Sequence, residues 1–109
     1  MRKQTKVNTV INGQEVTVEQ DSLTGQFFVR QNTGNIPVDY ATISDRVTIG
    51  QCIKYWRLRY GYSQAELAER IGVSSPNVIA MWENAHRKPQ KQYRLRLAEQ
   101  LGYDILTKD

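Results

Sequence analysis

Few side chains in this sequence could carry out catalytic chemistry, and they lie far apart along the chain. Cys52 is the only cysteine and His86 is the only histidine. A structural zinc site takes about four Cys or His ligands, and an internal disulfide needs two cysteines, so neither is expected. The acidic residues are scattered, and no nucleophile–base pair or phosphate-binding glycine loop is visible. The sequence therefore predicts a protein that is not an enzyme and uses no metal or cofactor, with Cys52 as a small packed residue rather than a redox sensor.

Basic side chains are enriched instead, and they lie mainly in the second half of the chain. The formal net charge is +4. Residues 1–47 contain five Lys or Arg and five Asp or Glu, whereas residues 48–109 contain ten basic and six acidic residues. A basic half favours a polyanionic partner, although an ordinary charged surface would have the same composition. Neither a membrane-spanning apolar run nor a signal-peptide pattern is present, so we expect a cytoplasmic protein without a membrane partner.

Residues 63–83 carry a two-helix pattern within this basic half. Ser63 followed by Glu66 is a capping box, which predicts the start of a helix, and Gly72 suits the left-handed residue that ends it. Ser74 or Ser75 offers a second N-cap, and the proline that follows suits the first position of a second helix. The residues expected to be buried are Leu67, Ala68 and Ile71 in the first helix and Val78, Ile79 and Trp82 in the second. Two helices joined by a tight turn, the second opening on small polar residues, can present a recognition helix to DNA.

Further helices are predicted on both sides of this pattern. Thr48 and Gln51 form another capping box, so a helix should run from there to about Tyr60. Its apolar face would hold Ile49, Ile53 and Trp56, while Lys54, Arg57 and Arg59 point mostly elsewhere. A fourth helix is expected over residues 90–101, with Leu97, Ala98 and Leu101 inward and Lys91, Arg94 and Arg96 exposed. After Gly102, residues 103–107 are expected to form a short strand within a tail that covers residues 103–109.

The first third of the chain is typical of β structure. Asn12-Gly13 is a strong hairpin signal, because both turn residues tolerate a positive φ. Residues 7–11, 15–19 and 26–30 would then form a three-stranded antiparallel meander within residues 1–35. Such a meander is too small to bury a core of its own, so it should pack on the helices or on another subunit. Residues 36–47, which include Pro37, are interpreted as a connector. The predicted fold class is α+β, with a small N-terminal antiparallel β meander followed by a four-helix domain at residues 48–102.

Residues 48–102 resemble the Cro/C1-type (XRE-like) helix-turn-helix family of phage and bacterial regulators. The matching residues are Ile49-Gly50, Ile53, Arg57, Gly61, Ser63-Gln64, Leu67-Ala68, Gly72-Val73-Ser74, Ile79, Trp82-Glu83-Asn84, Arg87, Pro89, Leu97-Ala98 and Leu101-Gly102. The resemblance implies a lambda-repressor-like helix-turn-helix domain that binds double-stranded DNA. It also implies a transcriptional regulator, expected to be a repressor, that binds an inverted-repeat operator as a homodimer.

The resemblance also implies roles for individual residues. A recognition helix at about residues 76–83 would lie in the major groove and offer Ser75, Asn77, Val78 and Met81 to the bases. Asparagine can bond adenine through two hydrogen bonds, and valine or methionine can contact a thymine methyl. The structural alternatives are a polar first-turn residue for Asn77 and core packing for Val78. Phosphate contacts are expected from Gln64, Ser74, Arg87, Lys88 and Lys91, with bracing of the recognition helix as the alternative for Gln64 and a solvated charge for Lys91. Arg57 and Glu83 match a pair that forms a partly buried salt bridge in the family.

The sequence departs from the family pattern at two places. Residues 73–83 number eleven where the family has ten, so the turn holds one extra residue near Ser74 and Ser75. Ala85 replaces the usual glycine, so Asn84 is expected to take the left-handed conformation. Residues 103–107 resemble a terminal strand by which some members pair into dimers.

A second function remains open at this point. In an antitoxin-type interaction protein, residues 1–35 would bind a partner protein while the helical domain binds its own operator. An accessory DNA-binding protein of a phage or mobile element is a third interpretation.

Overall fold

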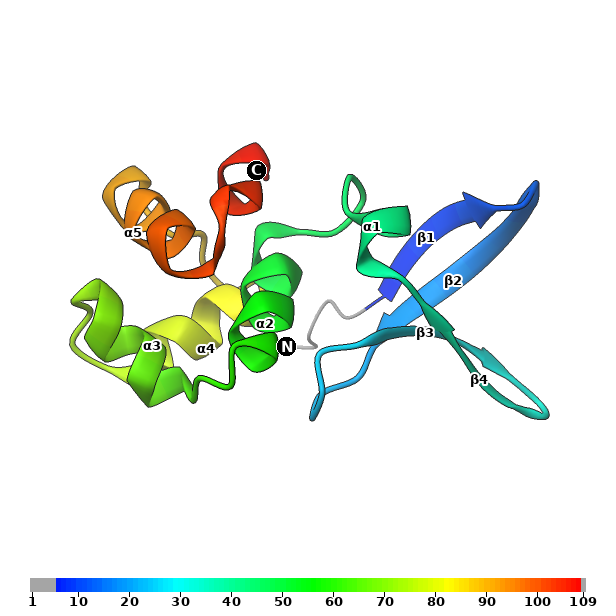
Figure 1. Cartoon of the computed structure of the whole chain (residues 1–109), viewed down its shortest axis with the longest axis horizontal. Helices are drawn as coiled ribbons and strands as arrows, with labels where there is room; N and C mark the ends of the chain where they lie inside the picture. Colours follow the sequence, from blue (N-terminus) through cyan, green and yellow to red (C-terminus); the bar gives the residue numbers. More distant parts are fainter. Residues whose placement is uncertain (1–5, 109) are drawn as a thin grey trace.

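The computed structural model describes residues 6–108, and it confirms the α+β architecture, with a sheet followed by helices (Figure 1). The strands are β1 (Lys6–Ile11), β2 (Gln14–Gln20), β3 (Phe27–Gln31) and β4 (Gly34–Val38). The helices are α1 (Tyr40–Ile43), α2 (Ile49–Arg59), α3 (Gln64–Ile71), α4 (Pro76–Glu83), α5 (Lys91–Leu101) and the 3₁₀ helix η1 (Tyr103–Thr107). Residues 1–5 of the expected meander and residue 109 of the expected tail lie outside the described residues.

The sheet is an antiparallel meander in the order β1-β2-β3-β4. The predicted hairpin is present, with Asn12 at φ 52° and Gly13 at φ 80°. At the next turn, the Asp21 carboxylate accepts hydrogen bonds from the N–H groups of Leu23 and Thr24 at 2.8 and 2.9 Å. The positive φ angles of the first turn and the hydrogen bonds of the second fix the register of the first three strands.

The prediction of three strands and a plain connector is wrong at residues 34–43. β4 pairs with β3 in the register Phe27↔Val38 to Gln31↔Gly34, and α1 follows directly. Pro37 obscured this strand, because a proline has no N–H for a sheet ladder. It is tolerated here because β4 is an edge strand. Phe27 is buried in the core, while its neighbour Phe28 lies on the opposite face of the sheet.

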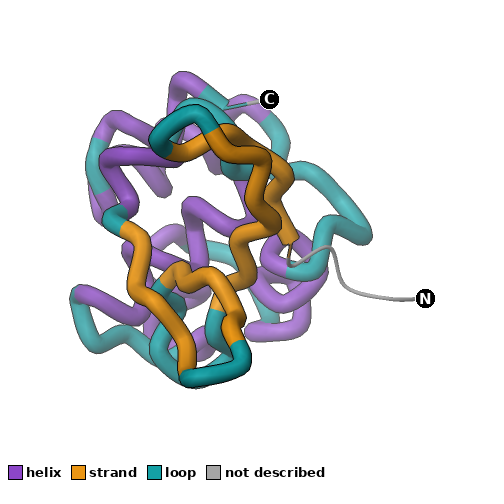
Figure 2. The backbone as a smooth tube through the Cα atoms, turned by 90° about the vertical axis from the view of Figure 1, so that its right-hand side faces the viewer, coloured by secondary structure: helices purple, strands orange, loops and turns teal. Residues whose placement is uncertain are grey.

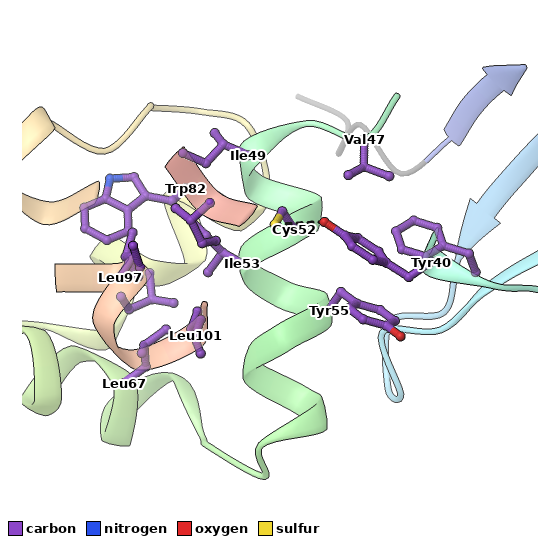
Figure 3. Close-up of a cluster of buried hydrophobic side chains, with 14 of the residues drawn as sticks. Tyr40, Val47, Ile49, Cys52, Ile53, Tyr55, Leu67, Trp82, Leu97 and Leu101 are labelled. Carbon is purple, nitrogen blue, oxygen red and sulfur yellow. Dashed lines mark hydrogen bonds between the residues drawn. The ribbon is translucent and has the colours of Figure 1, made fainter. Parts of the chain in front are cut away.

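Helix α2 lies between the sheet and the other helices and is buried on both sides. Its capping box is formed as predicted, with Gln51 N–H donating to Thr48 Oγ1 at 3.1 Å. Figure 3 shows Ile53 of α2 directed toward Leu67, Leu97 and Leu101, while Cys52 and Tyr55 face Tyr40. The rings of Tyr40 and Tyr55 stack with their centroids 4.4 Å apart. The single buried face expected from the sequence is therefore joined by a second, which also includes Lys54.

The C-terminal segment is a 3₁₀ helix, so the prediction of a terminal strand is wrong. Ile105 is buried in the shared core, and Asp104 accepts a hydrogen bond from the Tyr40 hydroxyl. This hydroxyl also lies 3.1 Å from Sγ of Cys52. Burial raises the pKa of the Cys52 thiol to about 11, which keeps the thiol protonated and unreactive near neutral pH. These contacts require a compact turn rather than an alternating strand.

Helices α2 and α4 approach each other closely at Gly50, in the first turn of α2. An added Cβ at this position would lie 2.2 Å from the Trp82 carbonyl oxygen and 3.0 Å from that of Glu83. Both atoms belong to the backbone of α4, so no side-chain rotation could relieve the overlap. Gly50 thus sets how closely α2 and α4 can approach.

We predict that Gly50→Ala lowers the free energy of unfolding by about 3 kcal/mol, because overpacking against backbone forces helices apart. Urea denaturation followed by circular dichroism measures this change. Gly61→Ala is the control: its position has a positive φ of 78° but open space around it, so it should cost only about 1–2 kcal/mol. Equal losses in the two variants would contradict the proposed steric constraint.

Candidate nucleic-acid interface

Helices α3 and α4 form a helix-turn-helix, and the capping chemistry predicted for both is present. Gly72 ends α3 in the left-handed conformation at φ 79°. Ser75 is the N-cap of α4, since its hydroxyl accepts a hydrogen bond from the Asn77 N–H at 3.1 Å. Val73 and Ser74 thus lie in the turn, ahead of the cap. The extra residue is therefore accommodated before α4 begins, and the helix runs without interruption from Pro76 to Glu83.

The exposed and buried sides of α4 are clearly separated. Ile79 and Trp82 are buried against the core, as predicted. Asn77 is exposed, whereas Ser75, Val78 and Met81 are half-buried. Val78 also packs against the core cluster, which was the structural alternative for it, and its base contact stays a prediction. The four residues expected to face bases thus come from one end and one flank of the helix.

A buried salt bridge ties α4 to α2. Arg57 Nε lies 2.6 Å from Glu83 Oε2, and the two side chains are 8% and 2% exposed. The guanidinium also donates to Glu83 Oε1 at 3.1 Å and to the Tyr62 carbonyl at 2.8 Å. Gln64, at the start of α3, donates to Glu83 Oε1 at 3.1 Å. One carboxylate therefore joins α2, α3 and α4, and Gln64 braces the recognition helix in this structure.

Basic side chains of the helical half separate into those that hydrogen-bond to the protein backbone and those that face solvent without such a bond. Arg94 donates to the Lys108 carbonyl at 2.8 Å, and Arg96 donates to the Ile71 carbonyl at 3.0 Å. By contrast, Arg87, Lys88 and Lys91 are exposed, and no salt bridge or hydrogen bond within residues 6–108 engages their side chains. These three residues lie on the loop after α4 and the first turn of α5, where a phosphate could reach them.

Arg96 is a positioning residue that the sequence did not reveal. A Cβ added at Gly72 would lie 2.9 Å from Nη1 of Arg96, so the Arg96 guanidinium packs on the turn between α3 and α4. Helical spacing predicted an exposed cation, and Arg96 is exposed, but this spacing gave no sign of its bond to the Ile71 carbonyl. Only the contact between α5 and the end of α3 shows that Arg96 holds this turn.

The left-handed residue after α4 is Ala85, so the prediction that Asn84 takes this conformation is wrong. Ala85 has φ 62° while Asn84 has φ −92°. Asn84 still donates its N–H to Ala80 O at 2.9 Å, in helical fashion, and His86 N–H then reaches back to Met81 O at 2.9 Å. The left-handed residue that reverses the chain therefore comes one residue later, at Ala85, although this conformation is unfavourable for alanine. It brings the exposed His86, Arg87 and Lys88 back over the end of α4.

A capped helix-turn-helix with an exposed polar start to its second helix and a solvent-facing basic loop defines a nucleic-acid-binding module. A family model described as helix-turn-helix matches residues 53–107. The chain therefore belongs to the helix-turn-helix family of Cro/C1 type, whose members are DNA-binding transcription regulators.

A relative from Archaeoglobus fulgidus is described as an uncharacterized HTH-type transcriptional regulator and is 35% identical over 66 residues. The match covers 54% of this chain and only 28% of that protein. No solved structure matches the chain significantly. Within residues 6–108, no helix is long and apolar enough to cross a membrane.

We predict that Ala85→Gly raises the free energy of unfolding by about 1 kcal/mol, because glycine relieves the cost of a left-handed alanine. Urea denaturation provides the measurement. Ala80→Gly, inside α4, is the matched control and should lower the stability by about 1 kcal/mol. If Ala85→Gly were destabilising as well, the left-handed assignment would have to be abandoned.

Proposed function

We propose that this protein is a sequence-specific repressor that binds an inverted-repeat operator as a homodimer, in the cytoplasm. The observation that carries the proposal is the placement of α4. Its exposed first turn is held on α2 by the buried Arg57–Glu83 pair and is flanked by the exposed Arg87, Lys88 and Lys91. Rigid presentation of a polar helix start beside cations is what major-groove reading requires.

Sequence selection is assigned to the start and outer flank of α4. The side-chain amide of Asn77 can donate its N–H to N7 of adenine and accept from the N6 amine with its oxygen, which makes it the main base-reading group. Val78 and Met81 offer apolar contact to thymine methyl groups. The Ser75 hydroxyl accepts the helix-capping bond but keeps its own hydrogen for donation.

Phosphate contacts are assigned to groups on both sides of α4. Arg87, Lys88 and Lys91 supply charge, while Ser74 in the turn and Gln64 at the start of α3 supply polar hydrogens. Gln64 is half-exposed, so its amide can reach solvent while it braces Glu83. Repression is the simpler regulatory outcome, because occupying a promoter needs only DNA binding.

A second candidate function is supported by the half of the sheet that extends beyond α1 and α2. The face that packs on α1 and α2 continues beyond them as an apolar strip of Ile11, Val16, Val29 and Ile36. Ile36 is 47% exposed, and the strip borders a groove of about 430 Å³ that ends at Asp39 and Thr42. An antitoxin-type protein would use such a surface to bind a partner protein while α4 binds DNA.

Two substitutions test the DNA assignments in a gel-shift titration with selected and random duplexes. Asn77→Ala should weaken binding by about 1–3 kcal/mol on the selected site only, because a base contact is lost. Lys88→Ala should weaken binding equally on both duplexes. It should also reduce the slope of log K against log salt concentration by about one, as expected for the loss of one phosphate contact. Wild-type affinity that is equal for all sequences and follows salt alone would refute the proposal.

The sheet candidate predicts that Ile36→Lys abolishes binding of a protein partner while DNA affinity stays unchanged. Affinity purification of the full chain, compared quantitatively by mass spectrometry with the variant, measures partner retention. Asn35→Lys is the control, because it adds the same charge on the opposite face of β4. A partner retained by Ile36→Lys, or lost equally from both variants, would contradict a role for the apolar strip.

A further inference from the structure

The sheet has two edges, and only one of them is blocked against a further strand. β1 and β4 are the outer strands. β4 contains Pro37, which offers no N–H and interrupts any added ladder. β1 contains no proline or glycine, its one charged residue is Lys6 at its start, and Val10 near its end is 59% exposed. An edge strand of this composition is a template for pairing with another extended chain.

The turn between β1 and β2 determines which main-chain groups face the open edge. Both turn residues have a positive φ, as in the two-residue turn that makes Ile11 and Gln14 exchange their N–H···O bonds. Bonded and non-bonded pairs alternate along an antiparallel ladder, so Thr9 also bonds to β2. Asn8 and Val10 therefore direct their N–H and C=O groups away from β2, and no other backbone–backbone bond within residues 6–108 engages them.

A second copy of β1 fits this edge in an antiparallel register centred on Thr9. Residues directly opposite each other in such a pair must both direct their main-chain groups to the partner strand, or both direct them away. Centring on Thr9 meets this condition, because it places Asn8 opposite Val10 of the second copy. Each of the two symmetric Asn8–Val10 pairs would exchange both N–H···O bonds. A register centred between two residues fails, because it would put an outward-bonding residue opposite an inward-bonding one.

The side chains of this register are compatible on both faces of the sheet. On the face that packs on the core, Val7 meets Ile11 of the second copy and Thr9 meets itself. None of the paired residues carries a charge, so two-fold pairing brings no like charges directly opposite each other. The groove of about 350 Å³ beside β1 contains Glu15 and Arg46, whose charges are of opposite sign. The chemistry of the edge thus fits a second copy of the same strand.

The sheet end of the molecule is open to a second copy. The molecule is 42 Å long, and Figure 1 shows the strands at one end of that axis and α3, α4 and α5 at the other. Figure 2 looks along this axis from the sheet end, with the helices behind the strands. Pairing through β1 therefore leaves the proposed DNA-facing surface of α4 uncovered.

Resting on the proposed homodimer, we infer that two copies pair through β1 and form one continuous eight-stranded sheet, with Thr9 on the two-fold axis. A stable interface takes about 20–30 residues a side, whereas the paired strands contribute six residues each. The dimer is therefore concentration-dependent, and it is measured at about 100 μM rather than at trace concentration.

Charge variants of Thr9 in the full chain test this register. Two lysines or two glutamates directly opposite each other repel, so Thr9→Lys and Thr9→Glu should each weaken self-association about tenfold. An equimolar mixture of the two variants should restore it, because a lysine then lies opposite a glutamate. Sedimentation velocity at about 100 μM measures the dimer fraction, and circular dichroism shows whether each variant is folded. The same two substitutions at Leu23, which is 84% exposed in the β2–β3 turn, are the control and should leave the dimer unchanged.

A cysteine at the same position gives a second test, which does not depend on charge. Thr9 opposite itself is a non-bonded pair, whose Cα atoms lie about 4.5 Å apart, within the range that a disulfide spans. Under mild oxidation, Thr9→Cys should form a covalent dimer on non-reducing gels much faster than Leu23→Cys does. Cys52 is buried, so it contributes no cross-link of its own.

The inference is overturned if the wild-type protein is monomeric at about 100 μM, or if the mixed charge variants dimerise no better than each variant alone. It is also overturned if Thr9→Cys cross-links no faster than Leu23→Cys. A failure of the proposed function looks different, because the selected duplex would then bind no better than random duplex while the β1 dimer persists in solution.

Discussion

The placement of α4 depends on one constraint, the contact between the first turn of α2 and the last carbonyls of α4 at Gly50. A side chain there would meet the Trp82 carbonyl at 2.2 Å, so only glycine permits this approach. Arg57 and Glu83 form a second attachment between the same two helices. Two attachments fix both the position and the direction of the recognition helix, which a single contact could not.

Features that could be predicted from the sequence are those fixed by bonds between near neighbours. The capping boxes at Thr48 and Ser63 and the left-handed Gly72 all formed as expected, because each satisfies its hydrogen bonds within a few residues. The family resemblance added what local chemistry could not supply. It identified Arg57 and Glu83, 26 residues apart, as a pair before their distance was known.

The errors share a different origin, since each depended on contacts from elsewhere in the fold. Pro37 is unfavourable in a central strand because it has no N–H, but β4 lies at the edge of the sheet, where a proline is tolerated. Polar and apolar residues alternate weakly over residues 103–107, which suggested a strand. A helical turn forms instead, because it buries Ile105 in the core while Asp104 accepts a hydrogen bond from Tyr40. Arg94 was expected to be exposed, but it is half-buried, and only the packing of the C-terminal segment against α5 reveals its bond to Lys108 O. No periodicity in the sequence encodes these three contacts.

The sheet and the helices share one core, which explains why only part of the sheet is available for a further role. Phe27 packs against the rings of both Tyr40 and Tyr55, and Gln20 donates to the Gln51 carbonyl in α2. The near half of the sheet is thereby committed to supporting α2, and through Gly50 to supporting α4. The far half, with the strip Ile11, Val16, Val29 and Ile36, lines an open groove that α1 borders at Thr42. A partner bound to the far half would therefore act on a surface that is continuous with the support of the recognition helix but separate from the DNA interface.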